Sequence, residues 1–317
     1  MRPIIALPFR NQKTLISEEA KQKLRDAGFD IICNQTGVRP TQEELIAMVK
    51  DAFGVIAGTE KYDETVLSEA KNLKVIVRFG VGTDNFDLAA MKKRGIKVGV
   101  ITNYNAVAEH ALALMLGIFK VLPKYDAEVR EGLWTRFPIR EITGKTVGIV
   151  GFGRVGRRLA ELLGGFKTDI LVYDPFVDGE KIRACGFTPV SFDELLERCD
   201  IVSLHLPATK DTHHIINRET LAKVKKGAYI VNTARGALID EAALFEALSE
   251  NRLGGAALDV FETEPVTKDN PLFTLDNTLL SPHVAASSIE TNINGSMTCV
   301  ESFIRVRDGG DPVYPIL

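Results

Sequence analysis

The chain has 317 residues, 45% of them apolar, which is enough for two ordinary domain cores. Its formal net charge of −3 gives no electrostatic reason to expect nucleic acid or an anionic membrane as a partner. We expect a cytoplasmic protein, because the opening residues do not resemble a secretory signal, no stretch approaches the roughly 20 apolar residues of a membrane helix, and the four cysteines form no CxxC pair.

Short apolar runs alternate with helical patterns from residue 1 to about residue 100. The predicted strands are PIIAL, DIIC, GVIAG, KVIVRFG and KVGV, and the helical patterns between them include SEEAKQKLRDAG and TQEELIAMVKDA. Alternation of this kind predicts a parallel sheet with helices on both faces.

A second series of the same kind begins at Lys145. Its predicted strands are TVGIVG, DILVYD, DIVSLHLP, AYIVNTA, GGAALDV and NTLLSPHV. Helical patterns separate most of them, so this part is predicted to be a doubly wound sheet of six strands.

Two long helical patterns connect the series. Residues 105–122 are apolar nearly all round and predict a long buried helix, and a similar helix is predicted after the last strand. We therefore expect an α/β chain with two doubly wound domains, in which residues 102–284 are inserted into a domain built from residues 1–101 and 285–317. Hinges are expected near residues 103–122 and 284–290.

A glycine-rich turn opens the inserted domain. Its GxGxxG glycines are Gly151, Gly153 and Gly156, and they follow a predicted strand and open a predicted helix. The first glycine permits the tight turn, the second permits close approach of a pyrophosphate, and the third permits helix–strand packing. The turn therefore predicts a dinucleotide site.

The start of the helix and the next strand complete that site. The amides of Arg154 and Val155 are expected at the helix N-terminus, where a phosphate is favoured. Asp174 follows Gly156 by 18 residues, where an acid binds the ribose hydroxyls and repels a 2′-phosphate, so NAD is preferred to NADP. The alternative is a structural βα turn with a surface aspartate.

Ionisable residues stand just past three later strands. They are Arg235, Asp259 with Glu264, and His283. Ligands of an open α/β sheet bind at these strand ends. Taken singly, each has a plainer explanation: Arg235 as a surface charge, Glu264 as a solvated loop residue, His283 as a core histidine.

As a set, these residues suit hydride transfer at a 2-oxo acid. A guanidinium polarises the carbonyl and holds the substrate carboxylate, and an imidazole beside a carboxylate donates the proton. Arg235, Glu264 and His283 supply these groups. The nicotinamide supplies the hydride, so no metal is needed.

The chain resembles the D-isomer-specific 2-hydroxyacid dehydrogenase family over essentially its whole length. The matching stretches are GVGTDNFDLAAMKKRGIKV, NAVAEHALALML, GKTVGIVGFGRVGRRLA, LHLPAT, VNTARGALIDEAAL, GAALDVFETEP and SPHVAAS. The resemblance implies that Arg235, Glu264 and His283 are catalytic, and that an NAD-binding Rossmann domain is inserted into a flavodoxin-like substrate-binding domain. The tract EGLWTRFPIREITGKT is similar to the phosphoglycerate dehydrogenase branch.

The resemblance also implies ligand contacts. The nicotinamide side of the cofactor is expected to be lined by Thr233, Ala234 and Asp259. The substrate is expected to be held by Arg235, by the amides of Val81 and Gly82, and by Arg78 as a second anion contact, although an ordinary turn before a helix is the alternative for this loop.

Two departures from the family pattern affect these expectations. Ala285 stands where the family usually has glycine and is expected to narrow the space near the nicotinamide amide, and TNYNAVAEH is shorter than the usual form. We expect no regulatory domain after Leu317 and therefore no serine feedback.

We predict an NAD-dependent oxidoreductase that interconverts a small D-2-hydroxy acid and its 2-oxo acid, with 3-phosphoglycerate and 3-phosphohydroxypyruvate as one candidate pair. A glyoxylate or hydroxypyruvate reductase stays open as an alternative. A second alternative is an NAD-sensing interaction module, like the corepressors of this family. The long apolar helix suggests a homodimer.

Overall fold

The computed structural model describes residues 2–9, 16–102 and 104–317. The predicted first domain includes residues 1 and 10–15, and the predicted hinge begins at residue 103; these lie outside the described residues. The chain divides into two compact units, unit 1 (Met1–Asn103 with Ala286–Leu317) and unit 2 (Tyr104–Ala285). Each is described by itself.

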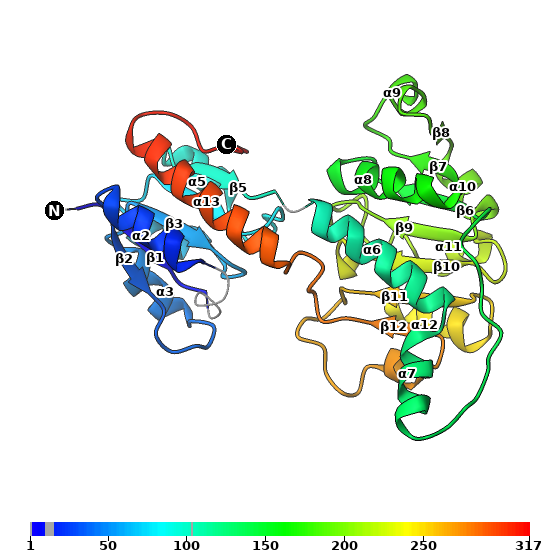
Figure 1. The fold of residues 1–317 in the computed structure, drawn as a ribbon. Helices are drawn as coiled ribbons and strands as arrows, with labels where there is room; N and C mark the ends of the chain where they lie inside the picture. The colour runs from blue at the N-terminus through cyan, green and yellow to red at the C-terminus, as the bar shows by residue number, and fades with distance from the viewer. Residues whose placement is uncertain (1, 10–15, 103) are drawn as a thin grey trace. The chain divides into compact units, whose positions relative to one another are not determined.

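Unit 1 is an α/β unit built around a parallel sheet (Figure 1). Its strands lie in the order β2-β1-β3-β4-β5. Their bounds are β1 Ile4–Leu7, β2 Asp30–Cys33, β3 Gly54–Ala57, β4 Val75–Arg78 and β5 Lys97–Val100. The helices are α2 Glu18–Asp26, α3 Gln42–Val49, α4 Glu64–Glu69, α5 Leu88–Lys93 and α13 Ile289–Arg307.

Helix α13 brings the end of the chain back into unit 1. Its buried residues Cys299, Val300 and Phe303 share a core cluster with Ile5 of β1 and Val77 of β4. The side chain of Ser17 caps α2, and the backbone N–H of Ser17 donates to Ser296 Oγ at 3.2 Å, which links α2 to α13.

Unit 2 holds the second parallel sheet, in the order β12-β11-β10-β9-β6-β7-β8. The strands are β6 Thr146–Val150, β7 Asp169–Tyr173, β8 Thr188–Pro189, β9 Ile201–Leu204, β10 Tyr229–Asn232, β11 Gly255–Leu258 and β12 Thr278–Leu280. The helices are α6 Tyr104–Phe119, α7 Leu122–Arg130, α8 Arg154–Leu163, α9 Gly179–Ala184, α10 Phe192–Arg198, α11 Arg218–Lys223 and α12 Glu241–Ser249, with 3₁₀ turns η1 Gly164–Phe166, η2 Gly236–Leu238 and η3 Pro271–Thr274.

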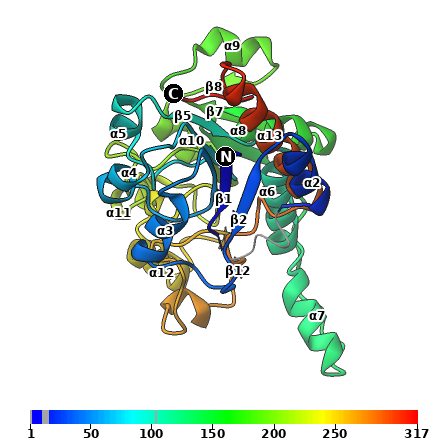
Figure 2. The ribbon, with the colours of Figure 1, turned by 90° about the vertical axis from the view of Figure 1, so that its left-hand side faces the viewer.

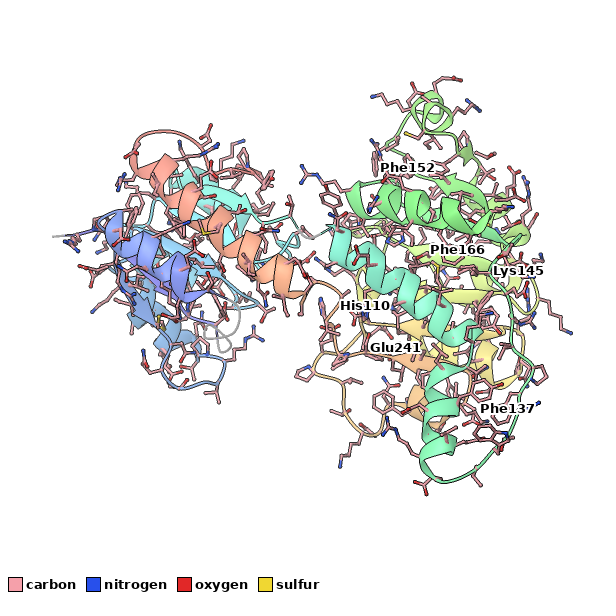
Figure 3. The ribbon with its side chains drawn as sticks, viewed as in Figure 1. His110, Phe137, Lys145, Phe152, Phe166 and Glu241 are labelled. Atoms are coloured by element: carbon pink, nitrogen blue, oxygen red, sulfur yellow. The ribbon has the colours of Figure 1, made fainter. Side chains whose placement is uncertain are left out.

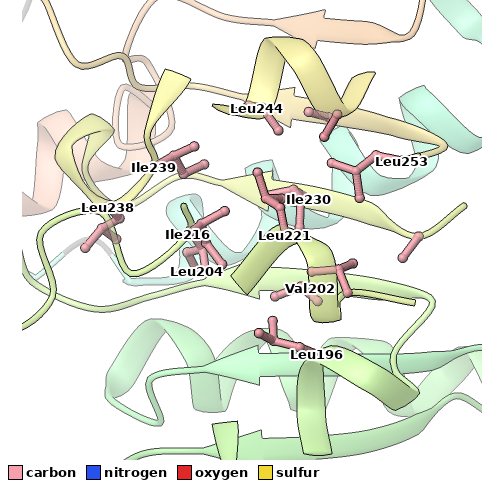
Figure 4. Close-up of a cluster of buried hydrophobic side chains, with 14 of the residues drawn as sticks. Leu196, Val202, Leu204, Ile216, Leu221, Ile230, Leu238, Ile239, Leu244 and Leu253 are labelled. Atoms are coloured by element: carbon pink, nitrogen blue, oxygen red, sulfur yellow. The ribbon is translucent and has the colours of Figure 1, made fainter. Parts of the chain in front are cut away.

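Apolar side chains cover both faces of this sheet. On one face, Leu196 of α10, Leu221 of α11 and Leu244 of α12 pack on Val202 and Ile230 (Figure 4). The other face is covered by α6 and α8, which contact each other. Burial on both faces explains the continuous apolar runs of these strands. The predicted α/β class with two doubly wound parallel sheets is confirmed.

Two elements of unit 2 differ from the prediction. Within the described residues the sheet has a seventh strand, β8, which is only two residues long and gives no periodic signal. The helix predicted over 105–122 ends at Phe119, because Val121 adopts a left-handed φ of 53° and α7 begins beside Pro123.

Helix α7 projects away from the rest of unit 2 (Figures 1 and 2) and has no buried residue. In the described part of the chain no single helix is long and apolar enough to cross a membrane. Among the described helices, only α6 and α7 taken together, bent by 61°, have the length and composition of a span, and α6 buries much of its surface within unit 2.

Candidate functional site

The glycine-rich turn joins β6 to α8. Gly151 has a φ of +100°, which makes the tight turn possible. A Cβ on Gly156 would lie 2.0 Å from the Gly151 carbonyl oxygen, so helix–strand packing requires glycine there. No described atom lies within 4 Å of a Cβ built on Gly153, so a ligand can approach the backbone closely at this point.

Asp174 is fixed against this turn. Its Oδ2 accepts from the backbone N–H of Phe152 at 2.7 Å, and its Oδ1 accepts from that of Phe176 at 2.9 Å. The carboxylate at the end of β7 is therefore held beside the start of α8, where Arg154 and Val155 form the first turn. The predicted ribose contact and the predicted phosphate contacts belong to one local structure.

A turn at the end of β10 is held by Asn232, a residue that the sequence analysis did not include in the site. Asn232 is fully buried; its Oδ1 accepts from the Ala234 N–H at 3.0 Å and its Nδ2 donates to the Arg235 carbonyl at 2.8 Å. Thr233 is 7% exposed, and its Oγ1 has no hydrogen-bond partner among the described residues. An orphaned buried hydroxyl at a strand end fits a residue that contacts a bound ligand.

Close backbone packing joins the Arg235 turn to the loop of Glu264. A Cβ on Gly236 would lie 1.9 Å from the Phe261 carbonyl carbon and 2.5 Å from the Glu262 nitrogen. Glu262 and Glu241 also exchange bonds, each carboxylate accepting the other residue's N–H at 2.6 and 3.1 Å. The guanidinium of Arg235 donates to the Ala234 carbonyl at 2.6 Å.

Glu264 and His283 form a direct pair. Glu264 Oε2 lies 2.7 Å from His283 Nδ1, and Oε1 accepts from the Phe261 N–H at 3.0 Å. The side chains are 35% and 50% exposed, so a substrate can reach the ring. Burial opposes ionisation of Glu264, but the bonds from His283 and Phe261 outweigh it and lower the pKa of the Glu264 carboxyl.

The backbone of His283 is held in the left-handed region, with a φ of 54°. This conformation is uncommon for residues other than glycine and persists where surrounding contacts enforce it. The N–H of His283 donates to the Asp259 carbonyl at 2.7 Å.

Asp259 is fully buried, and its carboxylate binds the loop that carries His283. Oδ1 accepts from Ser281 Oγ at 2.5 Å and from the Val284 N–H at 2.9 Å, and Oδ2 accepts from the Ala285 N–H at 2.9 Å. Burial alone raises the pKa of Asp259, but hydrogen bonds from His110, Ser281 and the backbone outweigh it and lower the pKa. Asp259, the predicted nicotinamide contact, therefore already accepts hydrogen bonds from the loop that carries His283.

The predicted substrate residues of unit 1 lie in the loop after β4. The N–H groups of Val81 and Gly82 donate to no described protein acceptor, and Val81 is 50% exposed. The guanidinium of Arg78 instead donates to backbone carbonyls, to those of Gly82 at 2.9 Å and Phe79 at 3.2 Å in its own loop and to that of Ala57 at the end of β3 at 3.3 Å.

Three residues with a place in the site were missed from the sequence: Asn232, Ser281 and His110. An asparagine at a strand end two residues before a turn is a signal for Asn232. Ser281 and His110 carry no such signal, because their partners are set by contacts between elements far apart in the sequence. Among the described residues, no group of three His, Cys, Asp or Glu side chains is arranged to hold a metal ion.

The chain is similar in sequence to known dehydrogenases and reductases. The sequence profile of the D-isomer specific 2-hydroxyacid dehydrogenase NAD binding domain matches residues 112–285. A D-3-phosphoglycerate dehydrogenase of Archaeoglobus fulgidus is 41% identical over 93% of this chain and 56% of its own length. A glyoxylate reductase of Thermofilum pendens is 38% identical over 94% of this chain and 91% of its own.

The chain spans about half the length of the phosphoglycerate dehydrogenases that it matches. Among solved structures, a Thermus thermophilus protein aligns over 99% of this chain and 100% of its own, with a TM-score of 0.89 and 32% identity.

Proposed function

Because the chain belongs to the D-isomer-specific 2-hydroxyacid dehydrogenase family and carries its NAD-binding domain, we propose that it interconverts a D-2-hydroxy acid and its 2-oxo acid with NAD. The observation that carries this proposal is the pair of Glu264 and His283, 2.7 Å apart, in a loop network joined to the Arg235 turn through Gly236.

The cofactor would be held by residues of unit 2. The turn Gly151–Gly156 and the start of α8 receive the pyrophosphate, Asp174 receives the ribose hydroxyls, and Thr233 Oγ1 and Ala234 lie on the nicotinamide side. In these residues NADH would supply the hydride for reduction of the substrate carbonyl.

The protein's own groups handle the proton and the charge. Nδ1 of His283 is engaged with Glu264, which leaves Nε2 as the nitrogen that donates a proton to the carbonyl oxygen. Glu264 stabilises the protonated ring and fixes its orientation. The Arg235 guanidinium holds the substrate carboxylate and polarises the carbonyl.

The substrate class has two candidates. A 3-phosphohydroxypyruvate reductase is supported by relatives named D-3-phosphoglycerate dehydrogenase. Three backbone carbonyls hold the Arg78 guanidinium, the cationic group expected to meet a phosphate, and this favours an unphosphorylated acid such as glyoxylate or hydroxypyruvate. The N–H groups of Val81 and Gly82, which donate to no acceptor among the described residues, suit a carboxylate in either case.

We propose a cytoplasmic homodimer. The apolar face of α6 packs on its own unit, and exposed apolar side chains gather instead on α7 and the segment after it: Leu122, Val129, Leu133, Trp134 and Ile139. Such a group of side chains is typical of a protein interface. Sizing the protein in solution tests this, and a monomer would contradict it.

Steady-state assays test the enzymatic proposal. NADH oxidation is measured with 3-phosphohydroxypyruvate, hydroxypyruvate and glyoxylate in turn. The wild type should turn over at least one of them, and His283→Ala should slow it by roughly 10² to 10⁴-fold, as loss of a general acid does. His213→Gln, a change at an exposed histidine of the same unit, serves as the control.

Wild-type inactivity on all three acids would overturn the proposal and favour an NAD-sensing role. Near-normal turnover by His283→Ala would remove this histidine from the mechanism.

A further inference from the structure

The loop from Ser281 to Ala285 is folded around one buried carboxylate. Ser281 Oγ and the N–H groups of Val284 and Ala285 all donate to Asp259, at 2.5 to 2.9 Å. The His283 N–H donates to the Asp259 carbonyl in the same loop. The left-handed backbone of His283 therefore depends on how firmly Asp259 is held.

A side chain from a distant element completes this network. His110 lies on α6 (Figure 3), at the edge of the buried face formed by Val107, Ala111 and Leu114. Its Nε2 lies 3.0 Å from Ser281 Oγ and 3.5 Å from Asp259 Oδ1, and its side chain is 26% exposed.

The direction of these hydrogen bonds follows from the carboxylate. The Asp259 carboxylate can only accept, so the Ser281 hydroxyl donates to it. The hydroxyl oxygen of Ser281 then accepts from Nε2–H of His110. A chain of donors thus runs from α6 to Asp259. The bond from His110 is also the leading contribution among those that lower the pKa of Asp259.

The network also joins both ends of unit 2. Helix α6 begins that unit and Ala285 ends it, so His110 links the first of its helices to the last residue of its loop.

Resting on the function proposed above, we propose that His110 is a positioning residue: its hydrogen bond to Ser281 and its contact with Asp259 hold the 281–285 loop so that His283 Nε2 is aimed for proton transfer. Displacement of a reacting group by about 1 Å can lower the rate by up to about 10²-fold. We expect the larger effect on kcat, because the groups proposed to hold the pyrophosphate and ribose lie on other elements, and a smaller effect on the KM for NADH through Asp259, the predicted nicotinamide contact.

The test uses two substitutions and one control in the full chain. His110→Ala removes the donor, and His110→Gln restores an N–H at a similar reach. His213→Gln is the matched control, an exposed histidine of the same unit. Measurements are kcat and KM for NADH, and amide hydrogen exchange at Val284 and Ala285 in the protein without cofactor.

We expect His110→Ala to lower kcat by roughly 10- to 100-fold and to change the KM for NADH by much less. We also expect faster exchange at Val284 and Ala285, and recovery of both by His110→Gln. Unchanged kcat and unchanged exchange in His110→Ala would overturn the proposal. An equal loss of kcat in His110→Ala and His110→Gln, accompanied by a lower melting temperature but by no change in exchange, would also overturn it. If the wild type is inactive on every acid, the proposed function fails, and the exchange measurement still decides the loop contact.

Discussion

His205 provides a stability test that is independent of turnover. It follows β9, its Nε2 lies 2.9 Å from Ser203 Oγ, and its N–H donates to the Val150 carbonyl. Burial disfavours the charged ring and lowers the pKa of His205 from 6.5 to about 4. The folded protein therefore keeps this ring neutral at a pH where the unfolded chain protonates it.

The sign and size of the effect follow from linkage. Because the pKa of His205 is lower in the folded protein, the neutral ring contributes to the free energy of unfolding. This contribution is complete above pH 6.5 and is lost as the pH falls through about 4. The whole difference is worth about 3 kcal/mol, of which about 2 kcal/mol is lost between about pH 7 and about pH 5.

The assay compares the wild type with His205→Gln, which retains a hydrogen-bonding group for Ser203 but does not titrate. Urea unfolding is followed by circular dichroism at the two pH values, with His213→Gln as the control. The wild type should lose about 2 kcal/mol more than His205→Gln on acidification. Equal losses, or an NMR titration of His205 near 6.5, would refute the reasoning.

Three further substitutions test the site. Glu264→Gln removes the charge beside His283 but retains a hydrogen-bonding group, so kcat should fall about 10²-fold; an unchanged kcat would exclude an electrostatic role. Gly236→Ala places a Cβ 1.9 Å from the Phe261 backbone and should lower the free energy of unfolding by about 1–3 kcal/mol and reduce kcat, whereas Gly164→Ala, with open space, should do neither. Asp174→Ala should raise the relative efficiency with NADPH, and an unchanged preference would mean that the ribose is held elsewhere.

Much of the architecture could be predicted because it depends on local pattern. Alternating apolar runs and helical patterns identify parallel sheets, and the GxGxxG turn opens α8 as predicted. The end of α6 was harder: Pro123 is a local signal for the start of α7, but the left-handed conformation of Val121 is one that its residue type disfavours and the sequence does not indicate it.

The residue types of the candidate site could be proposed from the sequence, but the hydrogen bonds between them could not. A strand-end position indicated Asp259 as a polar group of the site, and its partners could not be read from the sequence. Ser281 follows Asp259 by 22 positions and His110 precedes it by 149, so tertiary contacts alone decide that they share a carboxylate. The assignments of the catalytic, cofactor and substrate residues, Arg78, Val81 and Gly82 among them, all stay predictions.

The strand order of unit 2 separates two tasks. Loops after β6 and β7 carry the glycine turn and Asp174, whereas loops after β10, β11 and β12 carry Arg235, Glu264 and His283, and β9 lies between the two groups. Substitutions that exchange one dinucleotide for the other therefore need not disturb the acid–base pair. On the proposed assignments, the residues that would distinguish NAD from NADP and the residues that would transfer the proton lie in opposite halves of one sheet, so one set can be altered while the other is kept.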